Sequence, residues 1–368
     1  MSVPALVGGI ALRAYDLPAA CAFAAGYGLL VPILIYRIAV RRSRTLVLCE
    51  PICFTIERTI VYSLRAVVAA SPGTEAEGLS EYMQLTFALG FIYLANTLSK
   101  LTRCVLVNST NPPPESEADA MAQPAGASDP PPLVATDGFW KRTAQTDATA
   151  EDARLRFWFR RSSTMMTVLF LVGLTLGIVA TGHIYPSTDA PHNRFNQNMR
   201  YASTVIGLVL VLSEVTILFW ASRSVPRVDQ RAVRFLLCAT TLLLLPACYR
   251  LGVMLQLTPD FTAPTHSALN TRGDKAAFYI VHVLPEWLVA ALLAAVNVKE
   301  VCTMGLKGDF RWRDETPEER TKRWAKERAR AEKKAMKKSN KKAKGGIEVE
   351  FEMTMTAKAD ADSVVTLA

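Results

Sequence analysis

The residues best suited to chemistry in this chain of 368 residues are ionisable side chains inside long apolar stretches. A charged group inside a bilayer costs about 3 kcal/mol or more unless it is paired or hydrated, so each one needs a reason. The candidate ligand-binding or transport residues are Glu57, Arg58, Arg65, Glu214, Arg250, Tyr279, His282 and Glu286. The glutamates and arginines of this set balance one another, which predicts ion pairs inside a helix bundle rather than a pore with a net charge.

Helix geometry places several of these side chains on common faces. Arg58 and Arg65 are seven residues apart, so they share a face and lie about 10 Å apart along the helix axis. Tyr279, His282 and Glu286 follow i, i+3, i+7 spacing and also share a face. The whole set is expected to form a polar layer from the bilayer midplane into its outer half, as the floor of a ligand cavity. Ion pairing that only orients the helices explains the same residues equally well.

The elements that must position these residues are seven apolar stretches, each near the ~20 residues that a spanning helix needs. They cover residues 17–40, 45–70, 83–106, 163–184, 201–222, 233–257 and 276–299. Most of the 42 Lys and Arg residues fall on one side of the topology that these spans imply. Because basic loops stay in the cytosol, the sequence predicts an all-α, seven-transmembrane helix bundle with its N-terminus outside and its C-terminus cytosolic. Its location is then the plasma membrane or an endomembrane.

The composition changes along the chain and divides it into segments. Residues 1–16 are expected to be a short outer segment, and 17–306 the membrane domain. The inner loop at about 107–155 is rich in proline and low in large apolar residues, which predicts disorder. Residues 307–344 are expected to form a polybasic cytoplasmic helix, and 345–368 a disordered acidic tail.

The net charge of +9 comes from basic residues beside the spans and in the lysine-rich tail. We therefore expect membrane lipid, and in particular the anionic cytoplasmic leaflet, as the partner of the tail, and no nucleic acid. The seven cysteines all fall within spans or near their ends, which argues against an extracellular disulfide. Cys104 and Cys302 lie near predicted cytoplasmic ends, and we interpret them as small buried hydrophobes rather than palmitoylation sites.

Enzyme chemistry finds little support in the sequence. Of the four histidines only His282 lies deep in a span, which argues against a three-histidine zinc site. There is no P-loop and no Gly-x-Ser-x-Gly elbow. Lys299 stands at the end of the last span, so a retinal Schiff base is not expected there. We predict that the protein is not an enzyme and needs no cofactor or metal.

A short motif in the last two spans carries a resemblance to a known family. The motif residues are Tyr249-Arg250 in the sixth span, and Tyr279, His282 and Pro285 in the seventh. This pattern resembles fungal seven-helix proteins of the lipid-translocating exporter (aminocholesterol-resistance) type, or a related uncharacterised fungal branch. His282 replaces the usual acidic residue, and Val253 stands where that family has a glutamate. The resemblance implies movement or sensing of sphingoid bases or other amphipathic lipids.

Three functions are compatible with these observations. The leading hypothesis is a protein that translocates or senses an amphipathic lipid-like ligand, with Arg250, His282 and Glu286 facing a lateral or outward cavity. A seven-helix receptor that couples to a cytoplasmic signalling protein fits the same topology, although no Asp-Arg-Tyr-type motif ends the third span. The third is a structural membrane protein whose charges only pair with one another.

Overall fold

The computed structural model describes residues 3–71, 77–110, 139–181, 190–225, 227–258 and 263–309, with scattered positions between 318 and 336. The chain divides into two units, Met1–Trp312 and Arg313–Ala368. The described positions of the second unit are helical. The rest of the predicted polybasic helix, the acidic tail and residues 111–138 of the predicted inner loop lie outside the described residues.

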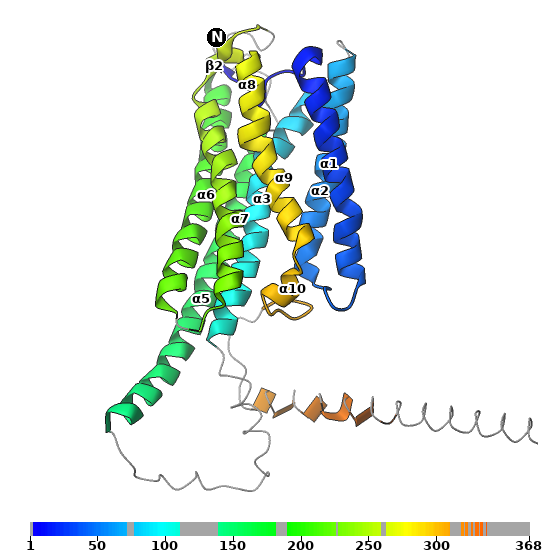
Figure 1. Ribbon diagram of the computed structural model, residues 1–368. Helices are drawn as coiled ribbons and strands as arrows, with labels where there is room; N and C mark the ends of the chain where they lie inside the picture. Colours follow the sequence, from blue (N-terminus) through cyan, green and yellow to red (C-terminus); the bar gives the residue numbers. More distant parts are fainter. Residues whose placement is uncertain are drawn as a thin grey trace, which may run out of the picture. The chain divides into compact units, whose positions relative to one another are not determined.

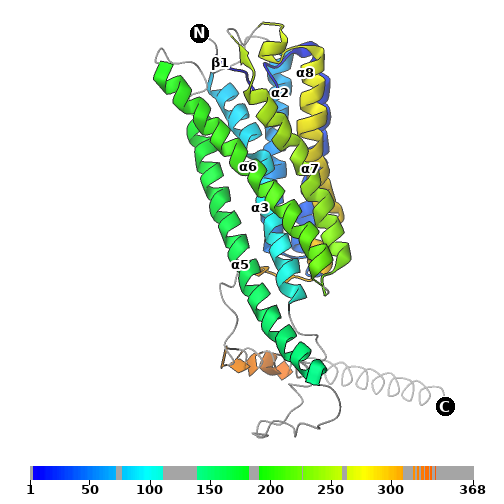
Figure 2. The same ribbon diagram turned by 90° about the vertical axis from the view of Figure 1, so that its left-hand side faces the viewer.

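Long helices make up the first unit and run side by side along it (Figures 1 and 2). In chain order they are α1 (Arg13–Ala39), α2 (Cys49–Ala70), α3 (Glu77–Ser109), α5 (Phe139–Thr181), α6 (Ala190–Ser224) and α7 (Gln230–Met254). The last long rod is continuous and consists of α8 (Arg272–Ala277), η3 (Phe278–Val283) and α9 (Leu284–Ala295). The short elements are η1 (Leu46–Leu48), η2 (His266–Ala268) and α10 (Val298–Val301).

Five of these helical segments are long and apolar enough to cross a membrane, judged by length and composition. They are Arg13–Ala39, Arg154–Ala180, Arg194–Ser224, Gln230–Met254 and His266–Ala295. Each contains or overlaps one of the predicted spans. The other two predicted spans form α2 and α3, which are also long helices but carry more charged or polar residues. The structure is therefore all-α and contains several helices suited to a membrane, as the apolar runs predict.

Helix α3 occupies the centre of the bundle. It contacts α2, α5, α6, α7 and α9, while α1 packs mainly along α2. The core along α3 includes Phe87, Phe91, Leu94 and Leu98, none of which is exposed. Because so many elements meet α3, a change at its surface is felt by most of the bundle.

The N-terminal segment folds back onto the bundle. Its strand β1 (Val3–Pro4) pairs antiparallel with β2 (Leu257–Thr258), and Val3 lies opposite Thr258. Ala5 continues this pairing, because its N–H donates to the carbonyl of Gln256 at 3.0 Å. Figure 1 shows this segment at the same end of the bundle as α8. The predicted short outer segment 1–16 is thus partly a structural element, and α1 begins within it at Arg13.

Helix α5 starts earlier than the sequence indicates. Residues 139–155 fall in the predicted disordered loop, but the structure makes them the first turns of α5. Ala, Arg, Lys and Glu side chains favour helix, and the following apolar residues extend the same helix, so propensity continues the helix backward from the span. The predicted span at 163–184 is therefore, up to Thr181, the second part of one longer helix that begins at Phe139.

The π-helix η3 lies where the last rod meets Pro285. A proline has no N–H for the carbonyl four residues earlier, here that of Val281, and its ring crowds that carbonyl. A wider turn just before the proline relieves this crowding, and such π-turns are frequent at functional sites. In η3 the side chains of Phe278, Tyr279 and His282 are all buried. The widened turn therefore directs the candidate residues of this rod into the bundle.

Candidate functional site

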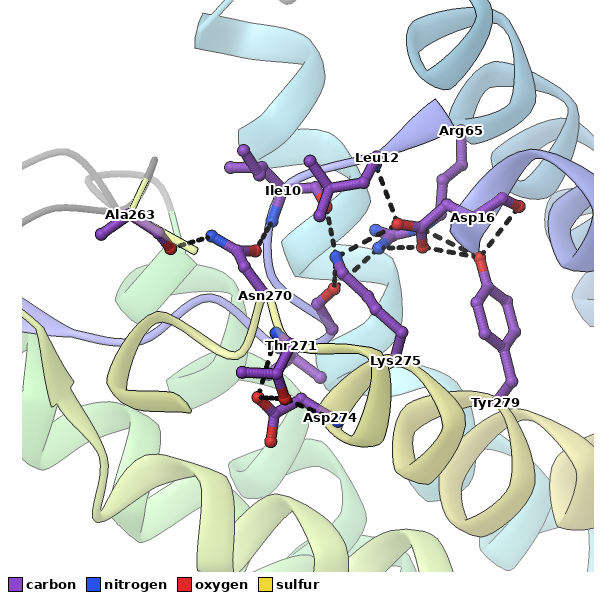
Figure 3. Close-up of polar contacts among 12 residues, drawn as sticks. Ile10, Leu12, Asp16, Arg65, Ala263, Asn270, Thr271, Asp274, Lys275 and Tyr279 are labelled. Atoms are coloured by element: carbon purple, nitrogen blue, oxygen red, sulfur yellow. Dashed lines mark hydrogen bonds and ion pairs between the residues drawn. The ribbon is translucent and has the colours of Figure 1, made fainter. Parts of the chain in front are cut away.

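The candidate residues separate into two groups. We define the N-terminal cluster as Asp16, Arg65, Lys275 and Tyr279, which surround the backbone of the N-terminal segment (Figure 3). The carboxylate of Asp16 accepts from Arg65 Nη2 at 2.7 Å and from Tyr279 Oη at 2.9 Å. Lys275 Nζ lies 3.1 Å from the other carboxylate oxygen of Asp16. A single buried carboxylate thus joins α1, α2, α8 and η3.

Backbone carbonyls of the N-terminal segment complete this cluster. Arg65 Nη2 and Lys275 Nζ each donate to the carbonyl of Gly8 at 2.7 Å, and Lys275 also donates to the carbonyl of Ile10. The fold of this segment depends on Gly8, whose φ of +74° lies in the left-handed region that favours glycine. The two cations are therefore paired with one carboxylate and with backbone oxygens, rather than with two carboxylates.

The sequence predicts Arg65 and Tyr279 as members of the candidate site but not their partners Asp16 and Lys275. On the predicted spans, Asp16 falls in the outer segment and Lys275 in an outer loop. A signal for Lys275 exists in the sequence, because Thr271 and Asp274 have capping-box spacing and do form that box in the structure. Starting the last helix there places Lys275 and Tyr279 four residues apart on one face. Asp16 has no comparable signal, since its role depends on α1 packing beside α2.

The second group, which we call the central cluster, consists of Glu57, Arg58, Arg250, His282 and Glu286. Its core is an ion pair in which Arg58 Nη2 donates to Glu286 Oε2 at 2.8 Å, with both side chains fully buried. Glu57 is the second carboxylate of this group, and its Oε2 lies 3.8 Å from Arg58 Nη1. Three candidate residues from α2 and α9 are thus brought together, and two carboxylates share one guanidinium.

A glycine makes room for this ion pair. A Cβ atom on Gly90 of α3 would lie 1.6 Å from Arg58 Nη2 and 3.1 Å from Glu286 Oε1. The guanidinium therefore packs directly against the backbone of α3. No larger residue fits there without moving Arg58, because real Cβ atoms essentially never approach another heavy atom within 3.0 Å.

Aromatic rings separate the central cluster from the N-terminal cluster. The ring of Phe87 lies 5.7 Å from Arg58 Cζ and 5.8 Å from Arg65 Cζ, so both guanidinium groups approach the same ring. Phe54 and Phe278 add further contacts, at 5.0 Å from Arg58 and 5.1 Å from Arg65 respectively. Each such contact is worth about 0.5–2 kcal/mol. The guanidinium groups of Arg58 and Arg65 therefore lie in one stack with these aromatic rings. An ion pair stands at each end of the stack.

Arg250 and His282 are only partly satisfied by their neighbours among the described residues. Arg250 has no carboxylate partner there, and His282 has no hydrogen-bond partner there. Arg250 donates to the carbonyls of Phe87 and Ala88 on α3, and the described residues place no carboxylate within 4.0 Å of it. His282 stacks on Tyr249 with ring centroids 5.7 Å apart, and its Nδ1 is 4.0 Å from Glu286 Oε1. Neither ring nitrogen of His282 has a hydrogen-bond partner among the described residues. The central cluster is thus incompletely paired.

Glu214 lies apart from both clusters. It is buried in α6, 1% exposed, and neither of its carboxylate oxygens has a hydrogen-bond partner in the described part of the chain. The expected balance of three glutamates against three arginines is therefore not the pairing seen. Of the three arginines, Arg58 pairs with the candidate Glu286, while Arg65 pairs with Asp16.

The opposite end of the bundle carries a smaller polar contact. Asp309 Oδ2 accepts from Arg160 Nε of α5 at 3.1 Å and lies 3.6 Å from Arg103 Nε of α3. The thiols of Cys104 and Cys302 are buried nearby, at 3% and 0% exposure. Burial, together with Cys104 and Asp229, raises the pKa of the Cys302 thiol to about 12. Cys302 therefore has the character of a small buried hydrophobe.

Comparison of the chain with protein-family models, with curated proteins and with solved structures found no match.

Proposed function

We propose that the chain is a seven-span integral membrane protein that translocates or senses an amphipathic lipid-like ligand. Five helical segments suit a membrane by length and composition, and α2 and α3 pack among them as equally long rods. In this proposal α2 and α3 also span, because their most deeply buried charged side chains face the bundle interior or a cleft rather than lipid. The excess of basic residues on one side of the predicted spans supports an outside N-terminus and a cytosolic C-terminus.

The observation that carries this proposal is the incomplete pairing of the central cluster. A purely structural network is expected to satisfy its buried polar atoms, because each unsatisfied one costs about 1–3 kcal/mol. Here both nitrogens of His282, Oε1 of Glu286 and Nε of Arg250 have no hydrogen-bond partner among the described residues. Ionisable residues at membrane depth are functional candidates by default. A polar head group or hydrating water brought by a ligand would satisfy them.

The motif that resembles the fungal lipid-translocating exporters falls within this region and supports the same proposal. Tyr249 stacks on His282, and Arg250 lies within electrostatic range of Arg58, His282 and Glu286. Pro285 follows the π-turn that carries Tyr279 and His282. In this proposal the motif residues act as one unit, although they come from α7, η3 and α9.

The test is efflux of a labelled long-chain amine from cells with and without the protein. His282→Asn, at expression and melting temperature equal to wild type, should lower the rate at least tenfold. The matched control is His266→Asn, because the His266 side chain is 69% exposed. Equal efflux in cells with and without the protein contradicts translocation of this substrate. Efflux that is unchanged in His282→Asn contradicts the role of the central cluster.

A receptor is the second candidate, and the Asp309 contact favours it. Asp309 follows α10 and bonds to α5 while lying beside α3, the helix that contacts most of the bundle. A signalling protein that competes for Arg103 and Arg160 would sense movement of α3. The discriminating measurement is binding of the amine without transport. The receptor is supported if the amine binds wild type and Asp309→Asn with the same affinity but releases a cytoplasmic partner only from wild type. The transporter is supported if the purified protein alone moves the amine across the membrane of vesicles.

A further inference from the structure

A cleft between α2 and α3 reaches the central cluster from the side of the bundle. Its volume is about 230 Å³. Its wall on α2 includes Cys53, Phe54 and Glu57, and its wall on α3 includes Leu89, Gly90 and Tyr93. Because Gly90 has no side chain, Arg58 lies directly behind the α3 backbone at this point. Gly90 therefore borders both the cleft and the guanidinium of Arg58, which pairs with Glu286.

The cleft opens outward rather than into the bundle. Cys53 is exposed, Tyr93 is 37% exposed, and the Glu57 side chain is 30% exposed. Glu57 is eight residues into α2, or about 12 Å along the axis from the start of the helix. In a spanning α2, an opening at that depth faces the hydrocarbon of the bilayer.

Charge inside the cleft favours a cation. Glu57 is the only charged side chain among the described residues that line it. Among the residues that the structure describes, Oε1 of Glu57 has no hydrogen-bond partner, and Arg58 lies 3.8 Å from its Oε2 while bonding to Glu286 at 2.8 Å. Glu57 is therefore the less closely paired of the two carboxylates. A ligand that brings one positive charge to Glu57 gives this carboxylate a closer partner.

The walls of the cleft favour an alkyl chain beside that charge. Phe54, Leu89 and Tyr93 are apolar or aromatic, and aromatic rings also attract a cation. The chain has access to lipid directly from the mouth of the cleft, so only the head group and the first part of the chain need to enter. Amphiphiles with an anionic head would add to the negative charge at Glu57 and are expected to be excluded.

We infer that the α2–α3 cleft is a lateral binding site for a single-chain amphiphile with one cationic head group, and that Glu57 pairs with that head. This inference rests on the proposed function, since it assigns an entrance and a head-group charge to the lipid-like ligand. Binding at Glu57 acts on Arg58, and through Arg58 on Glu286, because Arg58 lies within 4.0 Å of both carboxylates.

The experiment uses a long-chain primary amine that carries a diazirine beside its head group. The full chain in phosphatidylcholine vesicles is irradiated with this probe, and the labelled peptides are mapped by mass spectrometry. We expect label between Cys53 and Glu57 and near Tyr93, removed by excess octadecylamine but not by octadecanol. Glu57→Gln should lower this label at least tenfold.

Glu50→Gln is the matched control for the substituted carboxylate. Glu50 lies on α2 seven residues before Glu57, hence on the same face, and it is already bonded to Asn96, Thr97 and Lys100 of α3. Its substitution should leave the label unchanged. Equal label in Glu57→Gln, or equal competition by octadecanol, overturns the pairing at Glu57. Efflux of the amine without any label in the cleft overturns this site and leaves the proposed function standing, whereas label in the cleft without efflux keeps the site and removes translocation.

Discussion

Replacing Gly90 by alanine tests whether the ion pair between Arg58 and Glu286 depends on close packing against α3. The added Cβ would lie 1.6 Å from Arg58 Nη2, and any tolerable contact requires at least 3.0 Å. Arg58 is fully buried and its guanidinium lies against the rings of Phe54 and Phe87, so any shift of that group disturbs these contacts. We expect the 2.8 Å contact with Glu286 to break.

The expected loss in the free energy of unfolding comes from the two buried charges that the broken ion pair leaves without partners. Separating a buried ion pair costs about 3–5 kcal/mol, because each charge is then buried without its partner. Alanine regains about 0.5–1 kcal/mol over glycine inside a helix. The net loss in the free energy of unfolding is therefore about 2–4 kcal/mol. At roughly 2–4 °C per kcal/mol, the melting temperature should fall by about 4–16 °C.

The assay is thermal unfolding of the purified protein in detergent, with Gly28→Ala as the matched control. Gly28 is also inside a long helix, and its Cβ would meet only Thr59 Cγ2 at an ordinary 3.7 Å. Gly28→Ala should leave the melting temperature equal or slightly higher. Gly90→Ala should also become harmless in a background with Arg58→Met and Glu286→Gln. The reasoning is refuted if Gly90→Ala is as stable as Gly28→Ala, or if its cost persists in that background.

Two further predictions concern the ends of the bundle. Asp16→Asn leaves Arg65 and Lys275 buried beside each other without a carboxylate, so the free energy of unfolding should fall by about 3–5 kcal/mol. Adding Lys275→Met should recover part of that loss in the same thermal assay, and a melting temperature unchanged by Asp16→Asn would contradict the role of this cluster. The Cys302 thiol is unexposed and its pKa is raised to about 12, so it is almost entirely protonated from pH 7 to 9. It should resist a water-soluble maleimide from pH 7 to 9 in the folded protein and react after denaturation, whereas labelling of the folded protein as fast as the exposed Cys49 would contradict its burial.

The long helices are largely predictable from the sequence because the signal for them is local. A run of about 20 apolar residues must satisfy its backbone within one helix, so its position is visible without knowledge of the neighbours. The predicted stretches accordingly coincide with α1, α2, α3, α6 and α7 and with the last rod. The start of α5 was less predictable, because residues 139–155 are polar and only propensity supports a helix there.

The candidate site was predictable in its members but only partly in its pairing. Depth in an apolar run singles out Arg58 and Glu286, and both are indeed fully buried and in contact. The balance of charges within the candidate set suggests that its arginines and glutamates pair with one another, whereas Arg65 pairs with Asp16, which lies outside that set. Charge balance counts groups along the chain, whereas pairing depends on which helix faces lie against each other.

By itself the sequence determined where helices form, which charges lie deep within them, and on which side the basic residues gather. These are properties of composition and of the 3.6-residue period. Only the tertiary structure decided that Asp16 neutralises Arg65, that Gly90 admits Arg58 against α3, and that Glu57 lines a cleft open on the side of the bundle. Each of these depends on a contact between residues distant in the chain, and such a contact is set by the packing of whole helices rather than by any local run of residues.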